Sequence, residues 1–431
     1  MLAAAAAASM WFYVIDILRA HQIADSRAKG TPRGNLSDLY PRWVGTREML
    51  LHHSNPYSRE VTLEIQEGYY GRRLDPNRPN DPKDQQGFAY PLYVVFLLLP
   101  LAGFTFHNVQ IFFYWLLGGL TALSVYLWLR LLRWRLRPPG YAGVIFLTLG
   151  SFAAVQGIRL QQLSLLVAAL LAFSAACVAG GFLFCGGALL ALSTIKPQLA
   201  WLLAGWLILW AISDWNRRRR LLLGFALVMA LLLGGAELVL PGWLRMFIAS
   251  IQQYHGYTQN ASVLDELAPW ASAGKILALL AIALSAYLLW KLRMVPENSD
   301  QFGRAIALLT AVTVLVVPMY APYNQVLLVP GILLLWKDRR LFLAGSRGLR
   351  LGCITGVLAL AWQWIASLAL TAGYFLISPA WPLERWKWPF FATFALPVLV
   401  FALTAIDLNR ATSGRRRGTL PEIRIELNAK R

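Results

Sequence analysis

Apolar stretches of roughly 15–25 residues recur along almost the whole chain, separated by short polar connectors. Such stretches are long enough to cross the hydrocarbon core of a bilayer as helices. Because lipid offers the backbone no hydrogen-bonding partner, each span must be helical. The pattern predicts an all-α polytopic membrane protein with apolar segments at about 2–19, 90–107, 109–133, 141–157, 163–179, 181–195, 198–213, 220–240, 270–291, 303–318, 322–337, 350–377 and 388–408.

One polar segment, residues 20–89, is far longer than the other connectors. It holds ten Lys/Arg and nine Asp/Glu, so it is nearly neutral, although the whole chain carries a net charge of +19. The excess lies in short connectors such as Arg130 to Arg137 and Arg217 to Arg220. Basic connectors favour the cytoplasmic side. We therefore expect residues 20–89 to form a first extracytoplasmic loop with amphipathic helices, and we expect no nucleic-acid partner.

The number of spans depends on segment 90–107. If residues 2–19 form an uncleaved first span, two further crossings before Arg133 would leave that basic connector outside. Segment 90–107 is interrupted by Pro100. A re-entrant or interfacial segment there gives about 12 spans with both termini inside. The alternative is 13 spans with one basic connector on the outer side. Either way, residues 1–410 form a single membrane domain and 411–431 a basic cytoplasmic tail.

Several classes of site are absent from the sequence. The three cysteines, Cys177, Cys185 and Cys353, fall in apolar segments without metal-ligand or disulfide spacing. The five histidines are scattered. Neither a phosphate-binding loop nor a dinucleotide-binding glycine motif occurs, nor an Asp-x-Asp pair of the kind that holds a divalent metal in soluble nucleotide-sugar transferases. We predict no metal and no cofactor.

Three charged residues are candidates for chemistry, one in the long loop and two near predicted span ends. Asp38, in an aromatic-rich neutral stretch, is a candidate general base; alternatively, Ser37 or Asp38 caps a helix that runs to Leu51. Lys196 interrupts two apolar runs. It either binds a phosphate or extends its ammonium to the lipid headgroups. Arg159 likewise either grips phosphate or anchors a helix.

Residues 320–325 form a polar, proline-flanked break with aromatic rings and amides. This composition suits sugar binding, although a proline-rich turn in an interfacial aromatic belt also explains it. The candidate substrate-binding residues are Tyr40, Tyr57, Tyr90, Gln161, Gln162, Gln198, His255, Tyr320, Tyr323, Asn324 and Gln325.

The order of these motifs resembles glycosyltransferase family 87 over roughly residues 10–330. It begins with Asp38-Leu-Tyr40 and continues through Asn55-Pro56-Tyr57 to Phe88-Ala89-Tyr90-Pro91-Leu92. Gln161-Gln162-Leu-Ser164 resembles the family's Gly-Gln motif, and Ile195-Lys196-Pro197-Gln198 its Lys-Pro-Gln motif. The chain departs from the family pattern in three places. Leu92 replaces a proline, Gln161 replaces a glycine, and residues 320–325 lack the histidine or tryptophan often found there.

The resemblance implies a GT-C-like helical bundle that transfers mannose, with inversion, from a polyprenyl-phosphate donor to a lipid or glycan acceptor at the outer face of the plasma membrane. It implies Asp38 as base and Arg159 and Lys196 as donor-phosphate ligands. The alternative is a transporter or flippase of lipid-linked or small polar substrates, which would place ionisable residues near mid-membrane. A membrane scaffold subunit, a third possibility, would not need Asp38.

Overall fold

A computed structural model describes residues 1–31, 37–257, 261–268 and 270–413. Every regular element in this part of the chain is a helix. The first is a continuous 27-residue helix, Leu2–Ala28, made of α1 (Leu2–Phe12), the π-helical η1 (Tyr13–Leu18) and α2 (Arg19–Ala28). Its alanine-rich start strongly favours a helix. The helix runs beyond the end predicted at residue 19, into the predicted loop.

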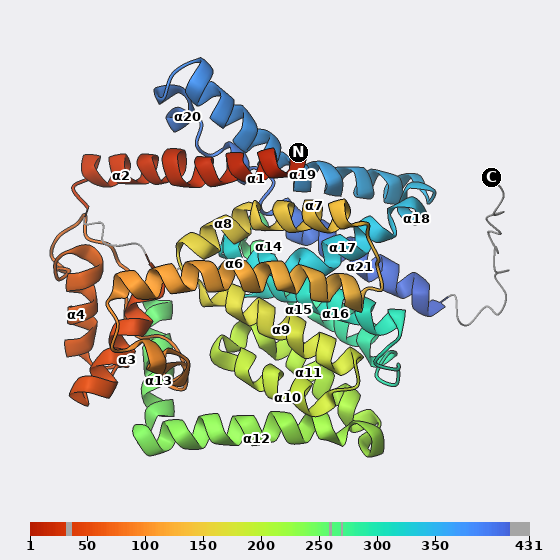
Figure 1. The fold of residues 1–431 in the computed structure, drawn as a ribbon, viewed down its shortest axis with the longest axis horizontal. Coiled ribbons are helices and arrows are strands. Elements are labelled where there is room, and N and C mark those ends of the chain that lie inside the picture. Colours follow the sequence, from red (N-terminus) through yellow and green to blue (C-terminus); the bar gives the residue numbers. More distant parts are fainter. Residues whose placement is uncertain (32–36, 258–260, 269, 414–431) are drawn as a thin grey trace.

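Three helices lie across one end of the bundle: α3 (Tyr40–His52), α4 (Arg59–Tyr70) and α13 (Trp243–Tyr257) (Figure 1). We call this the loop end. Helix α4 begins at Ser58, whose hydroxyl accepts the Val61 N–H, and ends at Gly71 with φ of 79°. A left-handed glycine is a common helix stop. Helices α3 and α4 belong to the segment for which the sequence predicts amphipathic helices.

Segment 90–107 does not form a spanning helix. Before the next helix begins at Phe106, it contains only α5 (Val94–Leu98) and the 3-10 turn η2 (Leu99–Leu101), with Pro100 inside that turn. The next helix, α6 (Phe106–Leu131), begins where the Thr105 hydroxyl accepts the Asn108 N–H. At 1.5 Å per residue, α5 and η2 are too short to cross a bilayer. This geometry agrees with the arrangement in which 90–107 does not cross.

The remaining helices form the bundle and its caps. They are α7 (Pro138–Leu149), α8 (Phe152–Arg159), α9 (Leu163–Ala179), α10 (Leu183–Leu192), η3 (Ser193–Ile195), α11 (Pro197–Ser213), α12 (Trp215–Val239), α14 (Val263–Leu267), α15 (Ala271–Trp290), α16 (Asp300–Val316), η4 (Pro322–Leu328), α17 (Val329–Lys337), α18 (Arg339–Leu343), α19 (Arg347–Leu376), α20 (Ala380–Glu384), η5 (Trp388–Phe390) and α21 (Ala395–Ser413).

The expected count of about 12 spans is not confirmed. In the described residues, six helices are long and apolar enough to cross a membrane, or seven if α7 and α8, which meet at a 59° bend, count as one broken span. Helices α9, α11 and the α10–η3 unit are apolar but shorter. Helix α9 is buried along most of its length. Such an interior helix is covered by protein, so its length need not match the bilayer.

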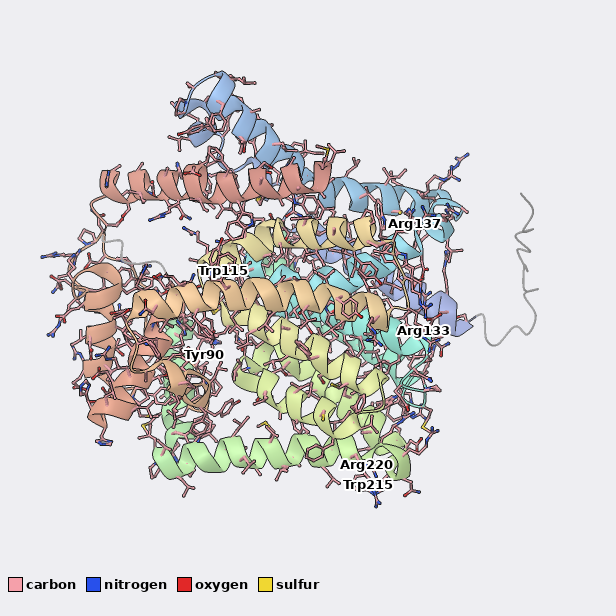
Figure 2. The ribbon with its side chains drawn as sticks, in the orientation of Figure 1. Tyr90, Trp115, Arg133, Arg137, Trp215 and Arg220 are labelled. Carbon is pink, nitrogen blue, oxygen red and sulfur yellow. The ribbon has the colours of Figure 1, made fainter. Side chains whose placement is uncertain are left out.

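The basic connectors gather at the end opposite α3 and α4, which we call the basic end. Figure 2 shows Arg133, Arg137 and Arg220 there, with Tyr90 toward the loop end. Arg304 of α16 is bonded at 2.6 Å to Asp338 and also to Asp407 of α21. Of the predicted basic tail 411–431, the structure describes residues 411–413, so the rest of this prediction lies outside the described residues.

Candidate active site

Asp38 lies in the turn before α3 and faces the break between α8 and α9. The N-cap of α3 is Leu39, which makes no side-chain capping bond, so the alternative in which Ser37 or Asp38 caps this helix is wrong. The Ser37 hydroxyl accepts the Leu39 N–H at 3.3 Å in the turn before the helix. The Asp38 N–H donates to the Leu160 carbonyl at 3.0 Å. Its carboxylate accepts a hydrogen bond from the Gln162 side chain. The turn therefore fixes this carboxylate against a second segment that is distant in sequence.

The break between α8 and α9 turns at Gln161, whose φ of 49° lies in the left-handed region that favours glycine. Its side chain stabilises the turn. The amide donates to the carbonyls of Ile158 at 2.9 Å and Arg159 at 2.7 Å, and its oxygen accepts the Ser37 hydroxyl at 2.7 Å. Gln161 thus has a structural role and orients its neighbour Gln162 toward Asp38.

Lys196 connects the next two segments, in the break between η3 and α11. It is only 8% exposed. Its ammonium donates to the Gln162 side-chain oxygen at 2.9 Å and to the Ser164 hydroxyl at 2.7 Å. Ser164 in turn donates to Asn324 at 2.8 Å. We call Asp38, Gln162, Lys196, Ser164 and Asn324 the polar chain. Lys196 points into the protein and not toward lipid headgroups.

Aromatic rings surround the two cations nearest Asp38. The Lys196 ammonium lies 5.7 Å from the ring centroid of Tyr90 and 5.5 Å from that of Tyr323. The Arg42 guanidinium lies 4.4 Å from the same Tyr90 ring. Cations are attracted to aromatic faces at such distances. The Tyr57 hydroxyl donates to the Tyr90 carbonyl at 2.7 Å, which holds this wall in place.

The cations of the site are bonded to neutral groups. Arg42 donates to the backbone carbonyl of Asp38 at 2.9 Å, and Lys196 is bonded to an amide and a hydroxyl. Burial, together with the charge of Arg42, lowers the pKa of Lys196 to about 7, and Asp38 opposes this change. Burial also raises the pKa of Asp38, opposed by Arg42, Lys196 and the Gln162 hydrogen bond. Such perturbed groups cluster at functional sites.

Asp38 also borders a cleft of about 440 Å³, a size typical of small-molecule sites. Residues of α2, α4 and α8 line it together with the connector after α4. They are Gln22, Asp25, Ser26, Lys29, Thr31, Asp38, Tyr69, Tyr70, Asn80, Pro82, Gln156, Arg159 and Leu160. Arg159 thus opens onto this cleft, whereas Lys196 belongs to the polar chain. Among the described residues, no cluster of three His, Cys, Asp or Glu side chains offers a metal site.

Comparison with known proteins places the chain in a family. Residues 88–318 match the family described as glycosyltransferase family 87, which is more than half of the sequence. The chain belongs to glycosyltransferase family 87. No curated protein and no solved structure matches it. This protein is therefore a multi-pass membrane glycosyltransferase. The match includes Gln162 and Lys196 but not Asp38 or Asn324, which the fold brings to the matched segments.

The structure brings together most residues expected at the glycosyltransferase site. Asp38, Gln162, Lys196 and Asn324 share one hydrogen-bonded chain. The others in contact with this region are Tyr57, Tyr90, Gln161 and Tyr323, with Arg159 at the cleft.

Five expected residues do not join this chain. Tyr40 packs against Phe106 and against Gly68 of α4. Gln198 and His255 are exposed on α11 and α13. The Gln325 amide donates to the hydroxyl of Tyr320 and to the Thr393 carbonyl, the latter at 2.6 Å. The side chains of the 320–325 break therefore point to two places: Tyr323 and Asn324 face the site, whereas Tyr320 and Gln325 bond the Thr393 carbonyl in the turn before α21.

Arg42 and Asp84 of this transferase were not predicted from the sequence, and Ser164 was noted only as part of the motif that begins at Gln161. Arg42 lies four residues after Asp38, a spacing that brings two side chains to the same helical face. That spacing was the available signal for it. Asp84 is fixed by the backbone N–H and side chain of Gln86 at 2.9 and 2.8 Å, and burial raises its pKa. Nothing in the local sequence distinguishes Asp84 from the other acidic residues of its polar connector.

Proposed function

We propose that this membrane glycosyltransferase moves a hexose, mannose in the first instance, from a polyprenyl-phosphate donor to an acceptor hydroxyl, with inversion at the anomeric carbon. The observation that carries the proposal is the hydrogen-bonded link from Asp38 through Gln162 to Lys196. It places a carboxylate and a cation at one site, as transfer of a sugar from a phosphate requires.

In the proposed reaction, Asp38 takes the proton of the acceptor hydroxyl. The acceptor oxygen forms a bond to C1 of the sugar, and the bond from C1 to the phosphate oxygen breaks. The electron pair of that bond leaves with the polyprenyl phosphate. Attack from the face opposite the leaving group inverts C1. The protein mainly has to orient the two substrates and offset charge on the departing phosphate.

We assign the donor phosphate to Lys196 and Arg42. Both cations lie beside Tyr90, and each is bonded to neutral acceptors. Their mutual repulsion contributes to the lowered pKa of Lys196. An anion between them would relieve that repulsion and form charge-assisted hydrogen bonds. The aromatic rings of Tyr90 and Tyr323 leave the two cations in a weakly hydrated setting, where such bonds are strongest.

We also propose that the loop end is extracytoplasmic. The gathering of Arg133, Arg137 and Arg220 at the opposite end supports this orientation. To test it, the natural cysteines are replaced by serine and one cysteine is introduced by Asn77→Cys or Arg137→Cys. In intact cells, a membrane-impermeant thiol reagent should label only the first variant. Labelling of only the Arg137→Cys variant would contradict the proposed orientation.

The reaction is tested with purified protein in lipid vesicles. It is supplied in turn with radiolabelled polyprenyl-phosphate mannose, polyprenyl-phosphate glucose and a nucleotide-linked mannose, each with a mixture of glycan and lipid acceptors. We expect release of polyprenyl phosphate and transfer of label from a polyprenyl-phosphate donor only. Transfer from the nucleotide sugar alone would contradict the proposed donor class.

A further inference from the structure

The cleft beside Asp38 has a composition different from that of the polar chain. Gln22, Asn80 and Gln156 contribute amides, and Tyr69 and Tyr70 contribute adjacent rings 4.9 Å apart. Two carboxylates, Asp25 and Asp38, face two cations, Lys29 and Arg159. The charges that line the cleft therefore balance.

The side chain of Gln156 lines the cleft. Its oxygen is buried and has no hydrogen-bond partner in the described part of the chain, so a ligand hydroxyl can bond it only when this side chain turns toward the cleft. Asp38 accepts the Gln162 bond through one carboxylate oxygen and borders the cleft, so a ligand hydroxyl there would lie beside the base.

The position of the cleft favours a polar ligand. Helix α2, which forms one wall, is the polar continuation of the apolar helix α1. In Figure 1, α2 and α4 lie at the loop end, away from the basic end. The cleft is therefore at the edge of the bundle where water and headgroups are accessible. Lys196 lies on the other side of Gln162, within the polar chain.

We propose that this cleft is the acceptor subsite, and that the acceptor presents a neutral, hydroxyl-rich sugar to Asp38. The inference rests on the proposed transferase function and deepens it. Asp38 then stands between the two substrates, with the donor phosphate at Lys196 and Arg42 and the acceptor sugar in the cleft. Arg159, expected from the sequence to bind donor phosphate, becomes an acceptor-binding residue.

The test measures both the transfer of label and the release of polyprenyl phosphate by the full-length protein in vesicles. Three acceptor probes are compared: methyl α-mannoside, octyl α-mannoside and octanol. Use of both mannosides indicates that a free sugar is sufficient, and use of octyl α-mannoside alone indicates a glycolipid headgroup. Either result supports the subsite. If donor is consumed but neither mannoside accepts label or raises the rate, the acceptor inference is overturned while the donor assignment stands. If no polyprenyl-phosphate sugar is consumed, the proposed function itself fails.

The variants Asn80→Ala, Gln156→Leu and Arg159→Gln locate the subsite. Each should raise the KM for the accepted mannoside about 3- to 10-fold, the scale of one lost hydrogen bond. The KM for donor and the acceptor-independent hydrolysis of donor should stay unchanged. Asn77→Ala, in the same connector but outside the cleft, is the matched control. A rise in donor KM for Arg159→Gln, with acceptor KM unchanged, would return Arg159 to the donor phosphate and overturn the proposal.

Discussion

Two buried charged clusters lie at opposite ends of the bundle and satisfy their cations in different ways. At the basic end, Arg304 is bonded to two carboxylates, Asp338 and Asp407, from two other segments. At the loop end, Lys196 is bonded to the Gln162 amide and the Ser164 hydroxyl. Both cations are largely buried, with Arg304 15% and Lys196 8% exposed.

The difference separates a structural cluster from a binding site. Removing a cation from a buried ion pair leaves carboxylates without compensation, which is costly. Arg304 thus joins α16 to α21 and to the end of α17. Lys196 and Arg42 have only neutral hydrogen-bond partners, and Lys196 reaches the carboxylate of Asp38 only across Gln162. Such an arrangement is suited to an incoming anion.

The largest expected effect is on turnover. The substitution Asp38→Asn keeps shape and hydrogen-bonding capacity but removes the base, so kcat should fall roughly 100-fold or more. Donor binding should persist, as measured with labelled donor in vesicles. Glu60→Gln, an exposed carboxylate on α4, is the control. Near-normal turnover of the Asp38 variant would remove Asp38 from the chemistry.

The substitution Arg304→Gln should act on stability. It leaves Asp338 and Asp407 buried without a cation, so unfolding should become easier by about 3–5 kcal/mol, read as a lower thermal midpoint in detergent. The fraction that remains folded should bind donor normally. Arg340→Gln, an exposed neighbour on α18, should leave the midpoint unchanged. Reduced donor affinity of folded Arg304→Gln protein would contradict the division between the two clusters.

For Lys196 we expect the opposite: a change in donor binding with little change in stability. Lys196→Gln should weaken donor binding by about 1.5–3 kcal/mol, the value of a charge-assisted hydrogen bond, which is about 10- to 150-fold in KM. Its thermal midpoint should change little, because glutamine can still bond Gln162 and Ser164. Arg245→Gln, an exposed cation on α13, controls for general charge. A lower midpoint with unchanged donor KM would assign Lys196 to structure.

A smaller effect is expected from pH. Lys196 has a pKa of about 7, so its charge is present below pH 7 and is lost as the pH rises through that value. Donor KM should therefore increase above pH 7, and Lys196→Gln should abolish this increase. Because the pKa of Asp38 is raised, kcat/KM should fall at the acidic end as Asp38 gains a proton. A pH profile in which donor KM does not change above pH 7 would contradict the assignment of the donor phosphate to Lys196.

Part of the site at the loop end was predictable from the sequence. Polar residues at apolar breaks are costly unless they serve a site, and this argument selected Gln162, Lys196 and Asn324, whereas Asp38 was selected as a carboxylate in the long loop. Sequence order could not show which side of a break each residue faces. Tyr320 and Asn324 are four residues apart, yet one bonds the Thr393 carbonyl and the other Ser164. The backbone geometry of the folded chain decides which of these two residues faces the site.

The fold was predicted in class but not in span count. Apolar length identifies helices that face lipid, such as α12, most of whose residues are exposed. It is less informative for α9, which neighbouring helices bury. Arg42 was not predicted from the sequence for a related reason. Its importance comes from the Tyr90 ring, which a distant segment supplies.

The most direct test of the central claim is a comparison of polyprenyl phosphate and the uncharged polyprenol as ligands of the wild-type protein in vesicles. If the cations at the loop end await an anion, the phosphate should bind at least roughly tenfold more tightly, the value of one charge-assisted hydrogen bond. That preference should fall in Lys196→Gln, which leaves only Arg42 for the phosphate, and should persist unchanged in Arg304→Gln. Equal binding of the two lipids by the wild-type protein would contradict the account.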